Sequence, residues 1–373
     1  MPAAVDDLRA VLHALRVEGP QSRRSLAHSL EMAPGTVVAA LEDLEHRGLV
    51  REAPTHRSTS GRPLKRWAIA PEARITLGVT FTERTLTLIA LDFAGGVRAR
   101  RDVPAPQPAT PVPVIRALSA AVEAVWDELA VVPATRLGVG IALPGVYAEG
   151  RGVLFLPNLP GWVGSDPKGM LEAALDLPVA MENDANAAAY AEGVLGAARG
   201  VDSFAYCMVA DGTGGAVRAG GQAVRGAIGA AGEFGHLRVD GRRVCNCGLV
   251  GCLETEASGL ALRRMLAEGV APDQAVEHMA TYLGDALANV VNCLAPEAVV
   301  LGGWVVEQHP ELVFAVANSA RAHTLPILAT HVRWLPGAVG ATAPAVGAAL
   351  MLMQSDAGVH AKGGENAAVP VRL

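Results

Sequence analysis

The hydrophobic pattern of the first seventy residues predicts three short helices followed by a two-stranded hairpin. Apolar positions recur at helical spacing in three runs, residues 5–17, 23–29 and 35–47. Two strand-like runs, 49–52 and 66–69, follow them and are separated by a polar loop. Helices joined by a tight turn and followed by such a hairpin are typical of a winged helix-turn-helix, whose last helix enters the major groove of DNA.

Beyond residue 75 the pattern alternates between strands and helices. Continuous apolar runs predict strands at residues 75–81, 85–91, 136–143, 178–182, 204–209, 298–301 and 330–335. Amphipathic runs predict helices at residues 112–130, 187–195, 255–268, 272–294, 310–324 and 344–353. This alternation favours an α/β fold with parallel strands. It also predicts two strand-rich halves, 76–197 and 198–353, and a flexible tail at 354–373, which has no core-forming run.

Composition places the chain among cytoplasmic globular proteins. No apolar run reaches the length of a membrane span, and the N-terminus is polar, without the apolar centre of a signal peptide. The chain has five cysteines, of which three cluster and two, Cys207 and Cys293, lie in apolar surroundings. This usage is typical of a reducing compartment, where disulfides are rare.

Charge is distributed unevenly along the chain. Residues 1–75 hold eleven Lys and Arg against nine acids, a net charge of +2, whereas the whole chain carries −6 and the remainder therefore −8. A basic N-terminal unit on an acidic body indicates a polyanionic partner for that unit. The asymmetry agrees with the DNA-binding prediction but does not establish it.

Three cysteines and one histidine form the densest cluster of potential metal ligands. Cys245, Cys247 and Cys252 follow the spacing C-x-C-G-x-x-G-C, and His236 lies just upstream. Three thiolates and an imidazole make a closed tetrahedral set for a structural zinc, and the two glycines allow the tight turns that such a knuckle needs. The alternatives are a catalytic zinc, which four protein ligands disfavour, and three unrelated buried thiols.

The segment GEFGH at 232–236, followed by CNCGLVGCLE at 245–254, resembles the signature of the ROK family of repressors, open reading frames and sugar kinases. The resemblance implies that His236 binds zinc and also touches a sugar, and that Glu233 and Glu254 hold sugar hydroxyls. It implies an α/β fold with two actin-like (ribonuclease H-like) lobes at 76–197 and 198–353. A winged helix-turn-helix domain of the all-α class, residues 1–72 (the head), precedes them.

A second match to the family lies at the predicted strand-to-helix junction. The segment ENDAN at 182–186 resembles the family's sugar site, and LPNLPGW at 156–162 resembles its pocket edge. The resemblance makes Gly145 and Asn183 sugar ligands and places Asp184 where the kinases carry their catalytic base. The alternative is that Asn183 or Asp184 merely caps the helix.

The chain departs from the kinases at their phosphate-binding loop. Residues 80–84, Thr-Phe-Thr-Glu-Arg, stand where ROK kinases carry Asp-x-Gly-Gly-Thr. Without those glycines the backbone cannot approach a nucleotide phosphate, so we expect no kinase activity and no catalytic residue. The Gly-rich segment at 211–215 is interpreted as a hairpin turn.

The DNA-binding residues are expected in α-helical and wing positions of the head. We expect Gly35 and Thr36 at the start of the recognition helix, Arg23 on the preceding helix, and Arg62 and Lys65 in the wing. The GRP at 61–63 also resembles the ROK repressors. The alternative for Arg62 and Lys65 is ordinary solvated charge.

The sequence therefore predicts a sugar-responsive transcriptional regulator of the ROK type, most simply a repressor. Its partners would be operator DNA and a small sugar or sugar phosphate. A homodimer or tetramer is expected, because one recognition helix reads only a half-site. The alternatives are a ROK sugar kinase with an accessory head, and a DNA-binding protein whose pocket serves only dimerisation.

Overall fold

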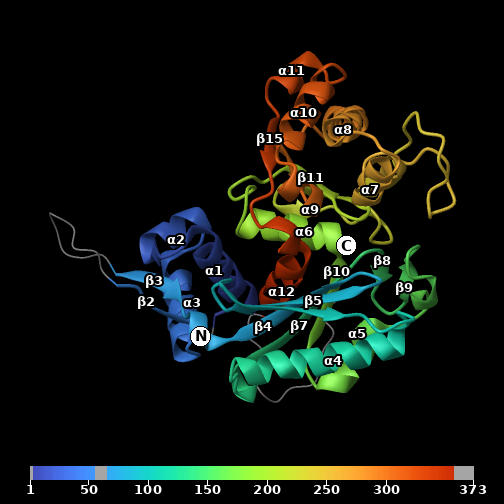
Figure 1. Ribbon diagram of the computed structural model, residues 1–373. Helices are drawn as coiled ribbons and strands as arrows, with labels where there is room; N and C mark the ends of the chain where they lie inside the picture. The colour runs from blue at the N-terminus through green and yellow to red at the C-terminus, as the bar shows by residue number, and fades with distance from the viewer. Residues whose placement is uncertain (1–2, 55–64, 357–373) are drawn as a thin grey trace.

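The head of the molecule holds three helices and a small sheet. The computed structural model describes residues 3–54 and 65–356 (Figure 1). The head comprises α1 (Val5–Glu18), β1 (Gln21–Ser22), α2 (Arg23–Ser29), α3 (Pro34–His46), β2 (Val50–Glu52) and β3 (Arg66–Ile69). Ser22 begins α2, since its hydroxyl accepts a hydrogen bond from the Ser25 amide at 3.1 Å. The predicted helices and wing strands are all present.

The head is not purely helical. Its strands form an antiparallel sheet in the order β1-β3-β2, so β1 adds a strand that the sequence pattern did not indicate. Most of the described residues of the head still lie in α1, α2 and α3, as the predicted all-α winged helix-turn-helix class requires. Its geometry fits a winged helix-turn-helix with α2 and α3 as the two helices. The wing loop between the strands, with Arg62, lies outside the described residues.

A mixed five-stranded sheet forms the centre of the first lobe. Its strands, in the order β10-β7-β4-β5-β6, are β4 (Ile75–Phe81), β5 (Thr85–Asp92), β6 (Val97–Pro104), β7 (Arg136–Leu143) and β10 (Val179–Asn183). The small hairpin of β8 (Val146–Ala148) and β9 (Gly152–Phe155) lies beside it. Two helices, α4 (Pro111–Glu128) and α5 (Pro167–Leu175), cover one face (Figure 1). Neither β6 nor the β8–β9 hairpin was predicted. Strand β6 faces solvent and is rich in arginine, so it lacks the apolar run by which the other strands were recognised.

The last helix that the structure describes, α12 (Ala343–Asp356), packs against the other face of this first sheet. The helix was predicted, but as the closing element of the second half. Its close approach depends on the glycine at position 78 of β4, where a Cβ atom would lie only 1.8 Å from the carbonyl oxygen of Ala345. It also packs along α6 (Asp184–Val194). The flexible tail predicted at 354–373 begins too early, because α12 continues to Asp356; the rest of that prediction falls on residues that the structure does not describe.

The second lobe has its own five-stranded sheet. Its strands, in the order β13-β12-β11-β14-β15, are β11 (Phe204–Val209), β12 (Thr213–Ala219), β13 (Gln222–Ala223), β14 (Ala298–Gly302) and β15 (Arg333–Pro336). Its helices are α7 (Gly259–Ala267), α8 (Pro272–Leu294), α9 (Trp304–Gln308), α10 (Glu311–Arg321) and α11 (Pro326–Ala329). A cluster of buried aliphatic side chains joins the sheet to α8 and α10. None of the helices that the structure describes is long and apolar enough to cross a membrane.

One predicted boundary shifts for a local reason. The helix expected from Thr255 begins at Gly259, because the Ser258 hydroxyl accepts a hydrogen bond from the Ala261 amide at 3.1 Å and caps it. The residues before it, Leu253–Thr255, form a 3-10 turn. This turn holds Glu254 beside the cysteine cluster rather than on a helix.

Candidate functional site

The four predicted metal ligands lie together. The ligand atoms of His236, Cys245, Cys247 and Cys252 all fall within 4.8 Å of one another. The sulfur atoms of Cys247 and Cys252 are 3.7 Å apart, and 3.8 Å separate the Cys245 sulfur from His236 Nδ1. Bonds of about 2.3 Å from a tetrahedral zinc would place sulfur atoms about 3.8 Å apart. The cluster therefore has the size and ligand chemistry of a structural zinc site.

The turn geometry of this knuckle depends on its two glycines. Gly248 has φ of 91° and Gly251 has φ of 79°, conformations that residues with a Cβ rarely adopt. Burial raises the pKa of the Cys245 thiol to about 12. The Cys245 thiol therefore keeps its proton in the absence of a metal, and metal binding would displace that proton.

The knuckle also reaches the first lobe. Asn246, between two of the cysteines, donates a hydrogen bond from its side-chain amide to Asn158 Oδ1 at 2.9 Å. Asn158 belongs to the predicted pocket-edge loop. A second contact between the lobes is the ion pair of Arg225 with Glu182 Oε2, at 2.6 Å. Both contacts connect the two lobes across the site.

The carboxyl end of β10 carries Asn183 and Asp184. Asn183 is the N-cap of α6: its side-chain oxygen accepts from the Asn186 amide at 3.1 Å, and its amide nitrogen donates to the Gly145 carbonyl at 3.2 Å. The Ala185 amide donates to Asp184 Oδ1 at 2.8 Å. The capping interpretation therefore holds for Asn183. It is compatible with a binding role, because the cap fixes the side-chain rotamer.

Contacts of Thr213 and Gly214 bring together three segments: the GEFGH segment, the turn that carries Glu254, and the start of α6. The Thr213 amide donates to Glu254 Oε2 at 3.1 Å. The carbonyl of Thr213 lies against Gly235, between Glu233 and His236, and a Cβ on Gly214 would lie 3.2 Å from the Cβ of Ala185. Thr213 is thus the point where the three segments meet. No sequence signal identified it beyond its place in a glycine-rich turn.

Asp184, Glu233 and Glu254 form a group of carboxylates (the carboxylate cluster) in which Glu233 and Glu254 affect the pKa of Asp184. Burial raises the pKa of Asp184 to about 7, the charges of Glu233 and Glu254 act in the same direction, and the hydrogen bond from Ala185 opposes them. Burial likewise raises the pKa of Glu233, while His236, 3.8 Å away, lowers it. Within the described part of the chain, no Lys or Arg pairs with any of the three.

The loop that replaces the kinase phosphate loop is closed on itself. The Thr82 hydroxyl accepts from the Arg84 and Thr85 amides at 3.2 and 3.1 Å, and the Thr82 amide donates to the Thr85 carbonyl at 2.9 Å. Phe81 is buried and stacks on Trp162 with ring centroids 4.9 Å apart. The backbone donors that would hold a phosphate are therefore already occupied.

The glycine-rich turn at 211–215 is also engaged by other groups of the protein. Asp211 Oδ1 accepts from Arg263 at 2.5 Å and from the Trp304 indole at 3.1 Å. The guanidinium of Arg263 lies 4.7 Å from the Trp304 ring. The turn thus packs against α7 and α9, and its Thr213 amide is engaged by Glu254.

An apolar cavity of about 500 Å³ lies elsewhere, between β11, β12 and the end of α8. Phe234, Val217 and Leu294 line it, and none of the three carboxylates does. Its lining is mostly apolar, with Ser203, Arg218 and Asn289 as the polar side chains, so most sugar hydroxyls placed there would lack a partner, at a cost of about 1–3 kcal/mol for each such buried group. The carboxylate cluster, not this cavity, has the chemistry of a sugar site.

The described residues that were predicted to contact DNA lie on the surface of the head. Gly35 is exposed and Thr36 half-buried in the first turn of α3. Arg23 is exposed, with its guanidinium 5.7 Å from the Trp67 ring. Lys65 is exposed and pairs with Glu52 at 2.8 Å, a surface contact of small energetic weight.

Comparisons with known proteins agree with the fold and with both kinds of function. A xylose repressor of Bacillus subtilis is 31% identical over 229 residues, 57% of this chain and 59% of its own length. A glucokinase of Streptomyces coelicolor is 30% identical over 303 residues, 70% of this chain and 89% of its own. This chain thus spans about three fifths of the xylose repressor that it matches.

Two solved structures have the same fold. A ROK family glucokinase from Streptomyces griseus, in complex with glucose and AMPPNP, has a TM-score of 0.66 and 28% identity and covers 74% of this chain and 98% of its own. A ROK family transcriptional regulator, a homologue of E. coli MLC, has a TM-score of 0.76 at 23% identity and covers 94% of this chain and 97% of its own. The regulator therefore matches the head as well as the two lobes.

The ROK family model matches residues 75–355, which span both sheets, the carboxylate cluster and the cysteine knuckle. The strand orders, the two lobes and the structural neighbours confirm the predicted actin-like α/β fold. On this evidence, the chain belongs to the ROK family.

Proposed function

We propose that this protein is a sugar-responsive, DNA-binding regulator of carbohydrate genes, most simply a repressor, without kinase activity. The observation that carries the proposal is a contrast between the candidate sugar ligands and the loop at 80–85. The predicted sugar ligands are intact and converge, whereas the loop of Thr82 and Thr85 has closed on its own backbone donors. Such a site can hold a sugar but has no phosphate cradle for ATP. The likeness to a ROK regulator over 94% of this chain supports the same conclusion.

The sugar would lie among Gly145, Asn183, Asp184, Glu233, His236 and Glu254. Carboxylates accept hydrogen bonds from hydroxyl groups, and an analogue that lacks a hydroxyl would leave one of them unpaired. The same charges favour an uncharged sugar over a sugar phosphate. At an effective dielectric constant of about 20, a negative charge about 5 Å from one carboxylate is repelled by about 3 kcal/mol.

The zinc would have a structural role. His236 and the three cysteines supply four ligands, which leave no open position for a water or a substrate. Bound zinc would hold the knuckle closed and thereby fix the ring of His236. It would also fix Glu254, which lies 3.5 Å from the Cys245 sulfur.

DNA would bind to the head, residues 1–72, with α3 in the major groove. Gly35 and Thr36 would face the base edges, Arg23 and Lys65 the phosphates, and Arg62 would contribute from the undescribed wing. A homodimer or tetramer would place two heads on a two-fold operator. The lobes at 76–197 and 198–353 share α12, which comes from the second segment and packs on the first sheet.

A sugar kinase is the second candidate. Asp184 stands at the family's base position, and its pKa of about 7 would suit a general base at neutral pH. Glucokinases are also among the relatives. The occupied donors around Thr82 argue against it.

The deciding experiment measures fluorescence anisotropy on DNA from the protein's own promoter, at fixed salt, with a panel of sugars and sugar phosphates. We expect specific binding that one uncharged sugar alters. Asp184→Ala should remove the response while DNA affinity stays unchanged, and Asp202→Ala, at an exposed site, should retain it. A response that survives Asp184→Ala would place the sugar elsewhere. Specific binding that no sugar alters would indicate a vestigial pocket, and ATP-dependent sugar phosphorylation would establish the kinase.

A further inference from the structure

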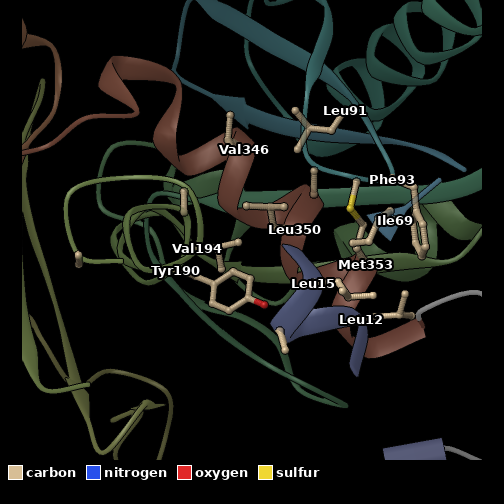
Figure 2. Packing of buried hydrophobic residues seen from close by; sticks show 14 of the residues in the cluster. Leu12, Leu15, Ile69, Leu91, Phe93, Tyr190, Val194, Val346, Leu350 and Met353 are labelled. Carbon is tan, nitrogen blue, oxygen red and sulfur yellow. The ribbon is translucent and has the colours of Figure 1, made fainter. Parts of the chain in front are cut away.

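The head and the lobes share one buried core. Apolar residues of α1 and β3 belong to the same cluster as those of α6, α12 and the β5–β6 turn. Figure 2 shows Leu12 and Leu15 of α1 beside Met353 of α12, with Phe93 of the turn and Tyr190 of α6 close by. This contact surface between α1 and the layer of α6, α12 and the β5–β6 turn is called the seam. The head is therefore docked on the body through side-chain packing.

Polar groups fasten the seam from both sides. Arg16 of α1 is only 8% exposed, and its Nη2 donates to the Phe93 carbonyl at 3.1 Å. Its guanidinium also lies 5.3 Å from the Phe93 ring. From the body, Arg199 donates to the Val17 carbonyl at the end of α1, and the Phe93 amide donates to the Pro71 carbonyl at 3.0 Å. These contacts fix the orientation of the head.

The seam buries positive charge without a counterion. Arg16 is buried in the seam, and the half-buried Arg218 of β12 lies next to the seam against Tyr190; neither is paired with a carboxylate among the residues that the structure describes. His13 lies beside them with a buried Nδ1 that has no partner. Burial lowers the pKa of Arg16, and burial followed by the charges of Arg16 and Arg218 lowers the pKa of His13. A buried cation without a counterion destabilises the docked state and so offsets part of the favourable packing of the seam.

Two elements run from the carboxylate cluster to the seam. Helix α6 begins at Asp184 and carries Tyr190 and Val194 in its second half. Its eleven residues span about 16 Å at 1.5 Å per residue. Strand β12 begins at Thr213, which holds Glu254, and ends near Arg218, whose guanidinium lies 5.5 Å from the Tyr190 ring. A shift of α6 at the sugar site would therefore move Tyr190, which packs in the same buried cluster as α1, and a shift of β12 would move Arg218, whose charge acts on His13 of α1.

We propose that the seam is the switch of this protein: a sugar at the carboxylate cluster moves α6 and β12, and this movement decides whether the head stays docked on the body. The proposal rests on the proposed function, because it needs a sugar response and DNA binding. The unpaired cations keep the docked and released states close in free energy. A ligand with a modest preference for one state can then change their populations.

The test removes the positive charge at Arg16 or at Arg218 but keeps a hydrogen-bond donor at the same position. In Arg16→Gln and Arg218→Gln an amide replaces the guanidinium, and Arg321→Gln changes an exposed arginine of α10 as the matched control. DNA affinity is measured by anisotropy with and without D-glucose and D-xylose. Hydrogen exchange of the α1 amides reports docking directly, without DNA or sugar.

We expect the two seam variants to dock the head more firmly. A sugar that changes the DNA dissociation constant of the wild type by about tenfold should change theirs by less than about twofold, while sugar affinity persists. Exchange of the α1 amides should be slower in both variants than in wild type and in Arg321→Gln. A full sugar response in Arg16→Gln and Arg218→Gln would overturn the proposal, and so would unchanged or faster exchange in α1. If the wild type shows no sugar response, the proposed function fails, and the exchange result alone still decides whether charge limits docking.

Discussion

Replacing Asp184 with asparagine should stabilise the ligand-free protein, and increasingly so as the pH rises. The carboxyl group is buried near Glu233 and Glu254 and has no basic partner among the described residues. Its pKa is raised from 3.8 to about 7, so ionisation is harder in the folded chain than in the unfolded one. Asparagine keeps an oxygen that can accept the Ala185 amide but cannot ionise.

The size and sign of the effect follow from linkage. The folded state holds this proton more tightly, so wild-type stability falls as the pH rises from about 4 to about 7 and is then constant with respect to this group. A tenfold difference in proton affinity between the folded and unfolded states corresponds to about 1.4 kcal/mol. Asp184 retains some solvent exposure, so we expect about 2–4 kcal/mol of added stability for Asp184→Asn above pH 7, most of which is lost by pH 4.

Urea unfolding of both proteins across this pH range measures the difference, because titrations common to the two cancel. Asp202→Asn, at an exposed site, is the matched control and should show no pH-dependent difference. A gap between Asp184→Asn and wild type that is the same at pH 5 and pH 8 would refute the reasoning. The carboxylate would then be solvated or paired in solution.

Three further predictions concern separate parts of the molecule. Cys247→Ser should lose bound zinc and lower the melting temperature, whereas Cys293→Ser, outside the cluster, should keep one equivalent of zinc. Metal analysis measures the zinc content, and calorimetry measures the melting temperature. Equal zinc in the two variants would show that the knuckle assignment is wrong. Glu192 is fully buried and accepts three backbone N–H groups from the turn after α6 and the loop before α12. Glu192→Gln should therefore cost about 1–3 kcal/mol in urea unfolding, and a loss below about 0.5 would contradict this account. Lys65→Ala should weaken binding to all DNA sequences alike and reduce the salt dependence of log K by about one unit, and selective loss for one sequence would show base contact instead.

Local order along the chain could be predicted from the sequence. The helical apolar spacing of α1 and α3 gives each helix one face to bury, whereas the continuous apolar runs of β4, β7 and β11 are typical of strands that are buried on both faces. The candidate metal ligands could also be predicted from the sequence. Their spacing is short, so a few turns with glycine at fixed positions bring three sulfur atoms together whatever the rest of the fold does.

The candidate sugar-site residues were predicted through the resemblance, but the effect of their charges on one another's pKa was not. Asp184 and Glu254 are seventy positions apart, and their approach depends on the contacts of Thr213 and Gly214 between the two lobes. The raised pKa of Asp184 is a consequence of that approach and of burial. Neither quantity has a local signature in the chain.

Tertiary structure alone decided where α12 packs and how the head is held. The sequence determined that 344–353 is helical, but its partner depends on a steric fit, in which β4 offers a glycine opposite the carbonyl of Ala345. Likewise, Arg16 appeared in the sequence as one polar position of an amphipathic helix, and only the docking of α1 against Phe93 and Tyr190 buries it. Local pattern fixes which face of an element is apolar, whereas the identity of the surface that covers it depends on shape and on contacts between residues far apart in the chain.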